Sequence, residues 1–479
     1  MSTEEETQED YSQISLRSKE LEFKDGTWPC PEDLLKRNEE IENLSPVILN
    51  AKAPLVLALD AQWGGGKTTF IELWQRYLEQ QGNVSLYINV WESDFSEDPL
   101  LPMLSALDKW FTDKSTSPKF RAFWEKAKNN ASGILKSTAV LTTKVVTLGT
   151  IEADKEIEKL ASEFTGNAVS SLLESFNKKK KSLEEFKRQL SKALETLPDS
   201  QKNLIIFIDE LDRCKPTYAI EVLERIKHLF DVDRLVFVLA VNRDQLSKSL
   251  QGVYGPNFNG LHYLKRFIDL DYQLRVPNIK DYIKAMVVQP EFTRLFNDRR
   301  EESQDYQYAG RLIGELASRF SYTLRDINQF ISRLGLILRS IPNNHYLDTF
   351  ILVPLMFLRQ EKPELYQSYI NNVMCANEVI EFLLKDSIDT ATLNHELALA
   401  MGSIIAASRN PYGDQTSLSI LLVPWKTRLE AMNDTNPMRD HVSTVIDWAL
   451  QNRLSRLRGD MHVSAFKRIE LISKININM

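Results

Sequence analysis

The sequence predicts an α/β fold in which a parallel sheet is flanked by helices, with a large helical insertion and an all-α C-terminal domain. The first observation is a set of continuous apolar runs of strand length, at 55–59, 204–208 and 235–241. Such runs are typical of parallel strands that are buried on both faces. The second observation is that beyond Pro277 the apolar residues recur at helical spacing, which predicts helices to the end of the chain.

The composition is that of a globular chain with a sizeable core. Of its 479 residues, 43% are hydrophobic and 26% are charged, and the length suits about three domains. A net charge of −7 gives no reason to expect nucleic-acid binding over the whole surface. Cys30, Cys214 and Cys375 lie far apart in the sequence and offer neither metal-ligand spacing nor a disulfide framework, which fits a reducing, cytoplasmic setting.

A glycine-rich turn between a predicted strand and a predicted helix indicates a phosphate-binding loop. The pattern G-x-x-x-x-G-K-[ST] is met except at its first glycine, which Ala61 replaces. Such a turn points backbone N–H groups at phosphate oxygens in front of a helix N-terminus. We expect Lys67 to reach the β- and γ-phosphates and the Thr68 hydroxyl to lie on Mg²⁺; a turn without a ligand is the alternative. The residues expected to bind nucleotide here are Gly64, Gly65, Gly66, Lys67, Thr68 and Thr69.

Two segments next to this loop carry weaker signals. Residues 28–44 form a turn and a helix, and a helix before the first strand often borders the base of a nucleotide. Arg37 is therefore a candidate for the adenine side of the site, and a solvated arginine is the alternative. The β-branched and aromatic run 84–91 predicts a second core strand, and we expect Trp91 at its end to lie in the core.

The segment from about 99 to 200 predicts a large helical insertion between strands of the sheet. The run Lys178–Lys181 suggests either a solvated helix face or a nucleic-acid arm, and neighbouring acids favour the solvated face. The stretch 134–151 comes nearest to a membrane segment. Lys136, Lys144 and several threonines interrupt it, so we predict no transmembrane span.

Two acids, Asp209 and Glu210, directly follow the apolar run 204–208. In open α/β sheets, ligands bind at the carboxyl ends of the strands, so we expect both carboxylates to face the phosphates. Asp209 would hold Mg²⁺, and Glu210 would orient and deprotonate the water that attacks the γ-phosphate. Asp212 and Arg213 are interpreted as a local ion pair or interface pair without a chemical role.

Two later residues are candidates for sensing or stabilising the reacting phosphate. Asn242 follows the strand 235–241, and its side chain would either bind the γ-phosphate or the attacking water, or cap the next helix. Arg266 precedes the last predicted strand and would neutralise charge in the transition state, in its own subunit or a neighbour's. An ordinary surface arginine is the alternative.

The C-terminal part is helical and carries one further candidate. The helix at 320–335 has a cap candidate in Thr323 with Asp326 in its first turn, and Arg325 beside them would contact phosphate. The remainder, 346–479, shows no motif and no repeat of fixed period.

These elements divide the chain into four predicted parts. Residues 1–27 are polar and acidic, and we expect them to be disordered rather than a signal peptide. A nucleotide-binding domain occupies 28–277 and contains the helical insertion. A helical lid at 278–345 and a C-terminal helical domain at 346–479 follow.

Five short strings of residues lie in this order along the chain: Trp63–Phe70, Asn89–Trp91, Ile208–Cys214, Tyr263–Phe267 and Leu324–Phe330. Taken together, they resemble the KAP family of P-loop NTPases over about residues 28–340. The tryptophan before the glycines and the string I-D-x-L-D-R-C are the most specific parts of this resemblance.

The resemblance implies a P-loop ATPase that uses ATP and Mg²⁺, with a helical insertion that carries transmembrane helices in many members but lacks them here. It places Trp63 in the nucleotide-binding loop. It raises Arg266 and Arg325 above ordinary surface arginines, because both fall on basic positions of the family. Many members have aspartate where this chain has Glu210. Bacterial members are often linked to antiviral defence, which the resemblance suggests here too.

We therefore expect an ATPase that acts as a switch or an assembly motor, with protein partners or self-association through its helical regions. One alternative is a binding scaffold that nucleotide only stabilises. Another is a nucleic-acid remodelling motor that uses the lysine run at 178–181.

Overall fold

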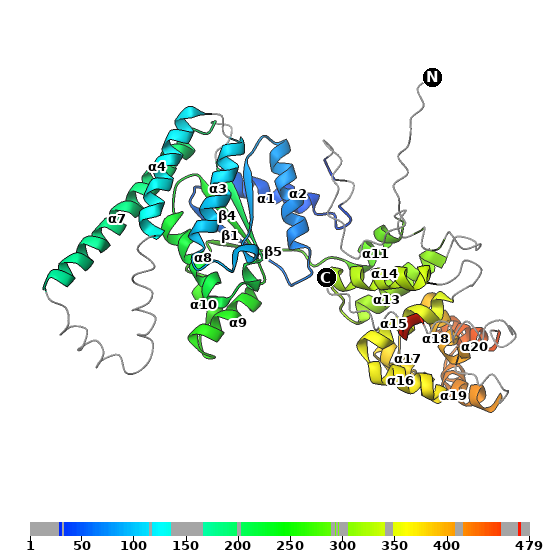
Figure 1. Ribbon diagram of the computed structural model, residues 1–479. Coiled ribbons are helices and arrows are strands. Elements are labelled where there is room, and N and C mark those ends of the chain that lie inside the picture. Colours follow the sequence, from blue (N-terminus) through cyan, green and yellow to red (C-terminus); the bar gives the residue numbers. More distant parts are fainter. Residues whose placement is uncertain are drawn as a thin grey trace, which may run out of the picture. The chain divides into compact units, whose positions relative to one another are not determined.

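A five-stranded parallel sheet organises the first part of the structure, a computed structural model (Figure 1). The strands are β1 (Leu55–Asp60), β2 (Ser85–Asn89), β3 (Leu204–Asp209), β4 (Leu235–Val241) and β5 (Leu270–Gln273). They lie in the order β2-β3-β4-β1-β5, and each neighbouring pair is parallel. Asp209 aligns with Asn89 on one side and Ala240 on the other, and Asp60 aligns with Val241. The predicted parallel sheet is confirmed, and the carboxyl ends of its strands share one edge.

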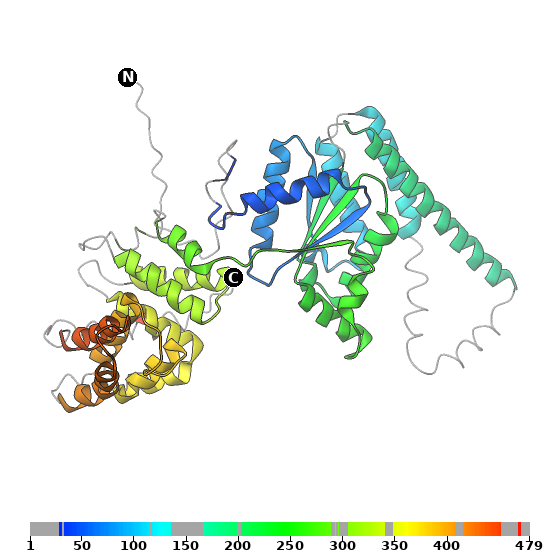
Figure 2. The ribbon, with the colours of Figure 1, turned by 180° about the vertical axis from the view of Figure 1, so that it is seen from behind.

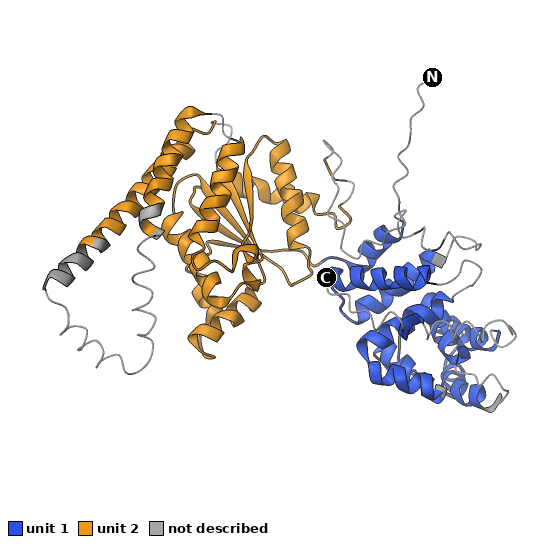
Figure 3. Ribbon diagram, in the orientation of Figure 1, with its two compact units in different colours: residues 1–22, 277–479 blue, residues 23–276 orange. Residues whose placement is uncertain are grey.

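The described residues belong to two compact units, the first ending at Val276 and the second beginning at Pro277 (Figure 3). The predicted disordered N-terminus lies outside the described residues. The structure describes residues 28–30, 33–114, 117–135, 166–198, 203–288, 293, 296, 305–340, 348–407, 415–451 and 468–470.

Helices cover both faces of the sheet in the first unit (Figures 1 and 2). On one face, Trp74 packs against Phe207 of β3 with ring centroids 5.4 Å apart. On the other face, Phe237 of β4 packs against Phe230, with centroids 6.0 Å apart. Because successive strand residues point to opposite faces, strands covered on both sides must be apolar throughout. The helices here are α1 (Asn38–Asn50), α2 (Lys67–Gln80), α8 (Pro216–Leu229), α9 (Arg243–Tyr254) and α10 (Gly260–Leu264).

The predicted helical insertion lies between β2 and β3 in the sequence. It contains α3 (Leu100–Lys114), α4 (Pro118–Leu135) and α7 (Gly166–Glu195), and α4 and α7 pack side by side (Figure 1). The lysine run 178–181 lies on α7. Residues 136–151 of the apolar stretch lie outside the described residues. Among the helices that the structure describes, none combines the length and the apolar character needed to span a bilayer.

The second unit consists of helices without a strand in its described part, as predicted. One hydrophobic core runs from Ile283 to Ile469, so the division into a lid and a C-terminal domain stays a prediction. Thr323 and Asp326 form the expected capping box. The helices are α11 (Ile279–Val287), α13 (Asp305–Arg319), α14 (Leu324–Arg339), α15 (Thr349–Glu361), α16 (Pro363–Asn371), α17 (Ala376–Leu384), α18 (His395–Ala407), α19 (Gln415–Ala431) and α20 (Arg439–Gln451).

Candidate functional site

The loop between β1 and α2 needs its three glycines for two backbone reasons. Gly64 and Gly66 have φ of 74° and 84°, in the left-handed region that favours glycine. A Cβ on Gly65 would lie 3.0 Å from the Gln62 carbonyl oxygen, which is too close without a shift of the backbone. Ala61 lies outside the left-handed region, so alanine is compatible with the position where the pattern has glycine. The loop therefore keeps the tight turn that the sequence predicts.

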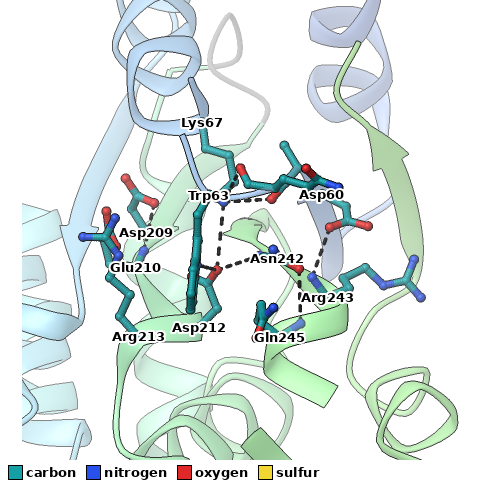
Figure 4. Close-up of polar contacts among 12 residues, drawn as sticks. Asp60, Trp63, Lys67, Asp209, Glu210, Asp212, Arg213, Asn242, Arg243 and Gln245 are labelled. Carbon is teal, nitrogen blue, oxygen red and sulfur yellow. Dashed lines mark hydrogen bonds and ion pairs between the residues drawn. The ribbon is translucent and has the colours of Figure 1, made fainter. Parts of the chain in front are cut away.

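The Lys67 ammonium is folded back onto the loop (Figure 4). Its Nζ donates to the Ala61 carbonyl oxygen at 2.9 Å, and to that of Gln62 at 3.4 Å. It also lies 3.9 Å from a carboxylate oxygen of Asp212. Burial lowers the pKa of Lys67, and the carboxylates of Asp212 and Asp209 partly offset this effect. The loop thus holds a cation at its centre against oxygen atoms.

The structure brings Thr68 and Asp209 into direct contact at the carboxyl edge of the sheet. The Thr68 hydroxyl donates to Asp209 Oδ2 at 2.7 Å. The Tyr87 hydroxyl lies 3.2 Å from the same oxygen, and burial together with the Asp209 charge raises the pKa of Tyr87, so the phenol stays a donor. The Glu210 N–H donates to Asp209 Oδ1 at 2.8 Å. Asp209 is thus a buried carboxylate, and hydrogen bonds from neighbouring residues fix the positions of both of its oxygens.

Glu210 has an unusual backbone and a specific partner. Its φ is 63°, a conformation that costs energy for any residue with a Cβ. Its Oε2 lies 2.5 Å from Nε of Arg213. Burial raises the pKa of Glu210, and the Arg213 charge opposes this rise. The interpretation of Asp212 and Arg213 as an ion pair is wrong, because Arg213 pairs with Glu210 instead.

Trp91 is half exposed, at 50%, so the prediction that it lies in the core is wrong. The strand β2 ends at Asn89, and Trp91 begins a short 3₁₀ turn, η1 (Trp91–Ser93), that departs from the sheet. The Arg213 guanidinium lies over the Trp91 ring, 5.7 Å from its centroid. The tryptophan therefore packs on the partner of Glu210.

Asp212 is a site residue that sequence reasoning missed. Its Oδ2 accepts hydrogen bonds from Trp63 Nε1 at 2.7 Å and from the Asn242 N–H at 2.9 Å, and it is the oxygen near Lys67 (Figure 4). Asp212 is therefore the point where the phosphate loop and the ends of β3 and β4 are joined. The second aspartate of the D-E-L-D string is the signal that would have identified it.

Asn242 caps a helix in this structure. Its side-chain oxygen accepts from the Gln245 N–H at 3.2 Å, at the first turn of α9. The predicted cap is present, and a contact with the γ-phosphate stays a prediction. Next to it, the Arg243 N–H donates to Asp60 Oδ1 at 3.1 Å, which ties the end of β1 to the start of the same helix.

Arg37 is 1% exposed, so the alternative of a solvated arginine is wrong. One guanidinium nitrogen lies 2.6 Å from Glu40, and the other lies 3.5 Å from the Gly65 carbonyl oxygen. Glu40 in turn accepts from the Tyr272 hydroxyl at 2.9 Å and from the Arg275 N–H at 3.1 Å. This network connects the phosphate loop with β5 and the residues that follow it. A contact between Arg37 and adenine stays a prediction.

Arg266 and Arg325 lie apart from these contacts. Arg266 is exposed after α10, with its guanidinium 5.6 Å from the Tyr263 ring centroid. We find no hydrogen bond or ion pair from its side chain to the phosphate loop in the described part of the chain. Arg325 is exposed in the first turn of α14, in the second unit. The roles assigned to both arginines stay predictions.

Comparison with known protein families identifies the loop and the strand ends as parts of one domain type. The sequence model of the "KAP family P-loop domain" matches residues 37–341. The chain belongs to the KAP family. The match covers every strand of the sheet and the glycine loop, so both belong to a P-loop NTPase domain, a domain type that binds nucleotide.

Two curated relatives are similar over part of their length. The phage T7 exclusion protein of Escherichia coli (strain K12) is 21% identical over 365 residues, which cover 73% of this chain and 47% of that protein. An uncharacterized protein of Methanocaldococcus jannaschii is 34% identical over 113 residues, which cover 22% of this chain and 56% of that protein. The chain thus spans about half the length of these relatives.

Two solved structures are also similar. The Aeropyrum pernix ORC2 protein matches with a TM-score of 0.35 and 11% identity, over 89% of this chain and 96% of that one. Cdc6p from Pyrobaculum aerophilum matches with a TM-score of 0.33 and 12% identity, over 92% and 96%.

The network around Glu40 generates a prediction about stability and pH. Burial acts to raise the pKa of Glu40, but the hydrogen bonds from Arg37, Tyr272 and the Arg275 N–H outweigh it and lower the pKa below the ordinary 4.5. A carboxylate with a lowered pKa stabilises the fold above about pH 4.5, and this contribution is lost as the pH falls through the folded-state pKa.

We expect Glu40→Gln to lower the free energy of unfolding at about pH 7 by roughly 3 kcal/mol, because it leaves the Arg37 charge buried without its partner. The difference from wild type should shrink toward about pH 4. Urea unfolding followed by circular dichroism measures both values. Glu39→Gln, at an exposed position of the same helix, is the matched control. A difference that is the same at both pH values would contradict the assigned role.

Proposed function

We propose that the chain binds ATP with Mg²⁺ and hydrolyses it, and that hydrolysis makes the protein a switch or an assembly motor. The observation that carries this proposal is the 2.7 Å hydrogen bond between Thr68 and Asp209, residues separated by 141 positions in the sequence. It joins the threonine after the loop lysine to the carboxylate at the end of β3. These are the two groups that hold the metal in P-loop NTPases.

The donor set at this point fits Mg²⁺. The ion prefers oxygen ligands and is usually held by one or two carboxylates, with waters and substrate phosphates completing its shell. The Thr68 hydroxyl and the buried Asp209 carboxylate supply such oxygens, and the Tyr87 phenol steadies the carboxylate. Thr68 and Asp209 would hold the ion, which when bound neutralises charge on the phosphates.

The rest of the loop suits a triphosphate. The N-terminus of α2 and the N–H groups around Gly64 to Gly66 favour anions. The Lys67 ammonium would exchange the carbonyl oxygens of Ala61 and Gln62 for phosphate oxygens, while Asp212 stays near it on the other side. Loop and lysine together would orient the γ-phosphate toward the acids at the end of β3.

Glu210 would accept a proton from the water that attacks the γ-phosphate. The attack forms a bond from the water oxygen to phosphorus while the bond to the β-phosphate oxygen breaks, and the water proton passes to the carboxylate. Burial raises the pKa of Glu210, which makes its carboxylate a stronger base than a solvated glutamate. Asn242 and Arg266 would contact the reacting phosphate.

Substitutions in the loop and at the base test this proposal directly. We expect Lys67→Ala to weaken ATP binding and to abolish phosphate release. Glu210→Gln should still bind ATP with wild-type affinity but lose turnover by about 100-fold or more, because only the proton acceptor is removed. Chelation of Mg²⁺ should abolish turnover in the wild type.

Phosphate release and ATP affinity are measured on the full chain, with any partner present. Glu184→Gln, at an exposed position of α7, is the control that should retain wild-type turnover. Equal rates in wild type, Lys67→Ala and Glu210→Gln would refute hydrolysis by this site. An ATP-induced rise in melting temperature without turnover would instead favour a scaffold that nucleotide stabilises.

We further propose a role in defence against phage. The support is the similarity to the E. coli phage T7 exclusion protein over 73% of this chain. Phage should form fewer plaques on bacteria that express the wild-type chain than on bacteria that express Lys67→Ala at the same protein level. Equal plaque numbers across a panel of phages would count against this role and leave hydrolysis untouched.

A further inference from the structure

Two residues from the strings that resemble the KAP family, Trp91 and Arg213, have no part in the scheme above. One is the tryptophan after β2, and the other is the arginine that ends the D-E-L-D-R string. The structure brings them together, because the Arg213 guanidinium lies 5.7 Å from the Trp91 ring centroid. The same guanidinium is 2.5 Å from Glu210 Oε2. Trp91, Arg213 and Glu210 thus form a chain of contacts that ends on the proposed base.

The backbone explains why Arg213 can reach Glu210. The residues after β3 form a 3₁₀ turn, η3 (Leu211–Arg213), closed by a hydrogen bond from the Arg213 N–H to the Glu210 carbonyl oxygen. In such a turn, side chains three positions apart lie on the same side. Glu210 and Arg213 therefore share one side (Figure 4). Asp209 contacts Thr68, and Asp212 lies near Lys67.

The charges around Glu210 leave Arg213 as its close cationic partner. Asp209 and Asp212 are acids and repel the Glu210 carboxylate, and Lys67 is held on the carbonyl oxygens of the loop. The Arg213–Glu210 pair is partly buried, so solvent screens it less than a surface pair. The direction of the Glu210 side chain thus depends on where the Arg213 guanidinium lies.

The position of Trp91 is fixed by contacts of its own loop. Asp94 accepts hydrogen bonds from the Lys215 N–H at 3.1 Å and, through its carbonyl oxygen, from Lys215 Nζ at 3.0 Å. The Ser93 hydroxyl lies 3.0 Å from the Tyr218 hydroxyl. These contacts tie the loop after β2 to the segment after η3. They hold the short loop that carries Trp91, whose ring offers a face on which a cation can rest.

We propose that Arg213 is a positioning residue for ATP hydrolysis: it holds the Glu210 carboxylate in the orientation that activates water, and Trp91 holds Arg213. The proposal rests on the function proposed for Glu210. Arg213 acts through Glu210 and touches neither ATP nor the metal. If Arg213 instead restrained Glu210 from reacting, substitution of Arg213 or Trp91 would raise kcat.

Steady-state turnover and ATP affinity of the full chain test the proposal. Arg213→Ala should lower kcat by about 10- to 100-fold, as a misplaced catalytic group does, while the Kd for ATP stays within about twofold of wild type, since phosphate binding is untouched. Arg213→Lys should recover part of the loss, because an ammonium can still pair with Glu210. Trp91→Ala should lower kcat by roughly two- to fivefold. Trp91→Phe should retain most of the wild-type kcat, because a phenyl ring also offers a face to the Arg213 cation.

Arg188→Ala is the matched control. Arg188 pairs with Glu185 at the same three-residue spacing, 2.7 Å apart, on α7, and its loss should leave kcat unchanged. The urea midpoint of each variant shows whether it is folded. If Arg213→Ala unfolds the chain, Arg213→Lys and the exposed Trp91 variants carry the test.

The outcomes separate this proposal from the function on which it rests. A wild-type or raised kcat in both Arg213 variants and in Trp91→Ala, with Glu210→Gln inactive, would overturn the positioning role alone. An unchanged kcat with a weaker Kd for ATP would also overturn it, because Arg213 would then act in binding. Equal turnover in wild type and Glu210→Gln would instead refute the role of the base.

Discussion

The hydrogen bond between Thr68 and Asp209 is the constraint on which the site depends. It requires the helix after the glycine loop to begin where β3 ends, although β4 lies between β1 and β3 in the sheet. Three parallel strands in register meet this requirement, since Asp60 aligns with Val241 and Asp209 with Ala240. The left-handed glycines then place Lys67 over the same edge. The arrangement of these strands thus brings the Thr68 hydroxyl within hydrogen-bond distance of the Asp209 carboxylate.

The four charged residues at the end of β3 and just after it form two pairs with different partners. Asp209 and Asp212 contact Thr68 and Lys67 of the phosphate loop, whereas Glu210 and Arg213 pair with each other. Each pair also contacts one exposed tryptophan. Trp63 donates to Asp212, and Trp91 lies under Arg213. The two large rings, at 44% and 50% exposure, each contact a charged side chain of the site.

The sheet, the glycine loop and the acids after β3 could be predicted from the sequence because each depends on local signals. An apolar run, a positive φ that needs glycine, and an acid at the end of a strand are all visible within a few residues. The surroundings of Trp91, Asp212 and Arg37 could not be predicted, because they include residues from distant segments. Asp212 takes its partners from residues 63, 67 and 242, and Arg37 donates to the Gly65 carbonyl oxygen, 28 positions away in the sequence. Residue type alone does not identify such partners.

The most direct test of this account is the binding of Mn²⁺, in place of Mg²⁺, measured by electron paramagnetic resonance with and without ATP. Wild type and Thr68→Ser should bind one Mn²⁺ tightly when ATP is present. Thr68→Ala and Asp209→Asn should each bind it at least about tenfold more weakly, because each lacks one of the oxygens that hold the ion. If all four proteins bind Mn²⁺ with the same affinity, Thr68 and Asp209 do not form the metal site, and the central claim is wrong.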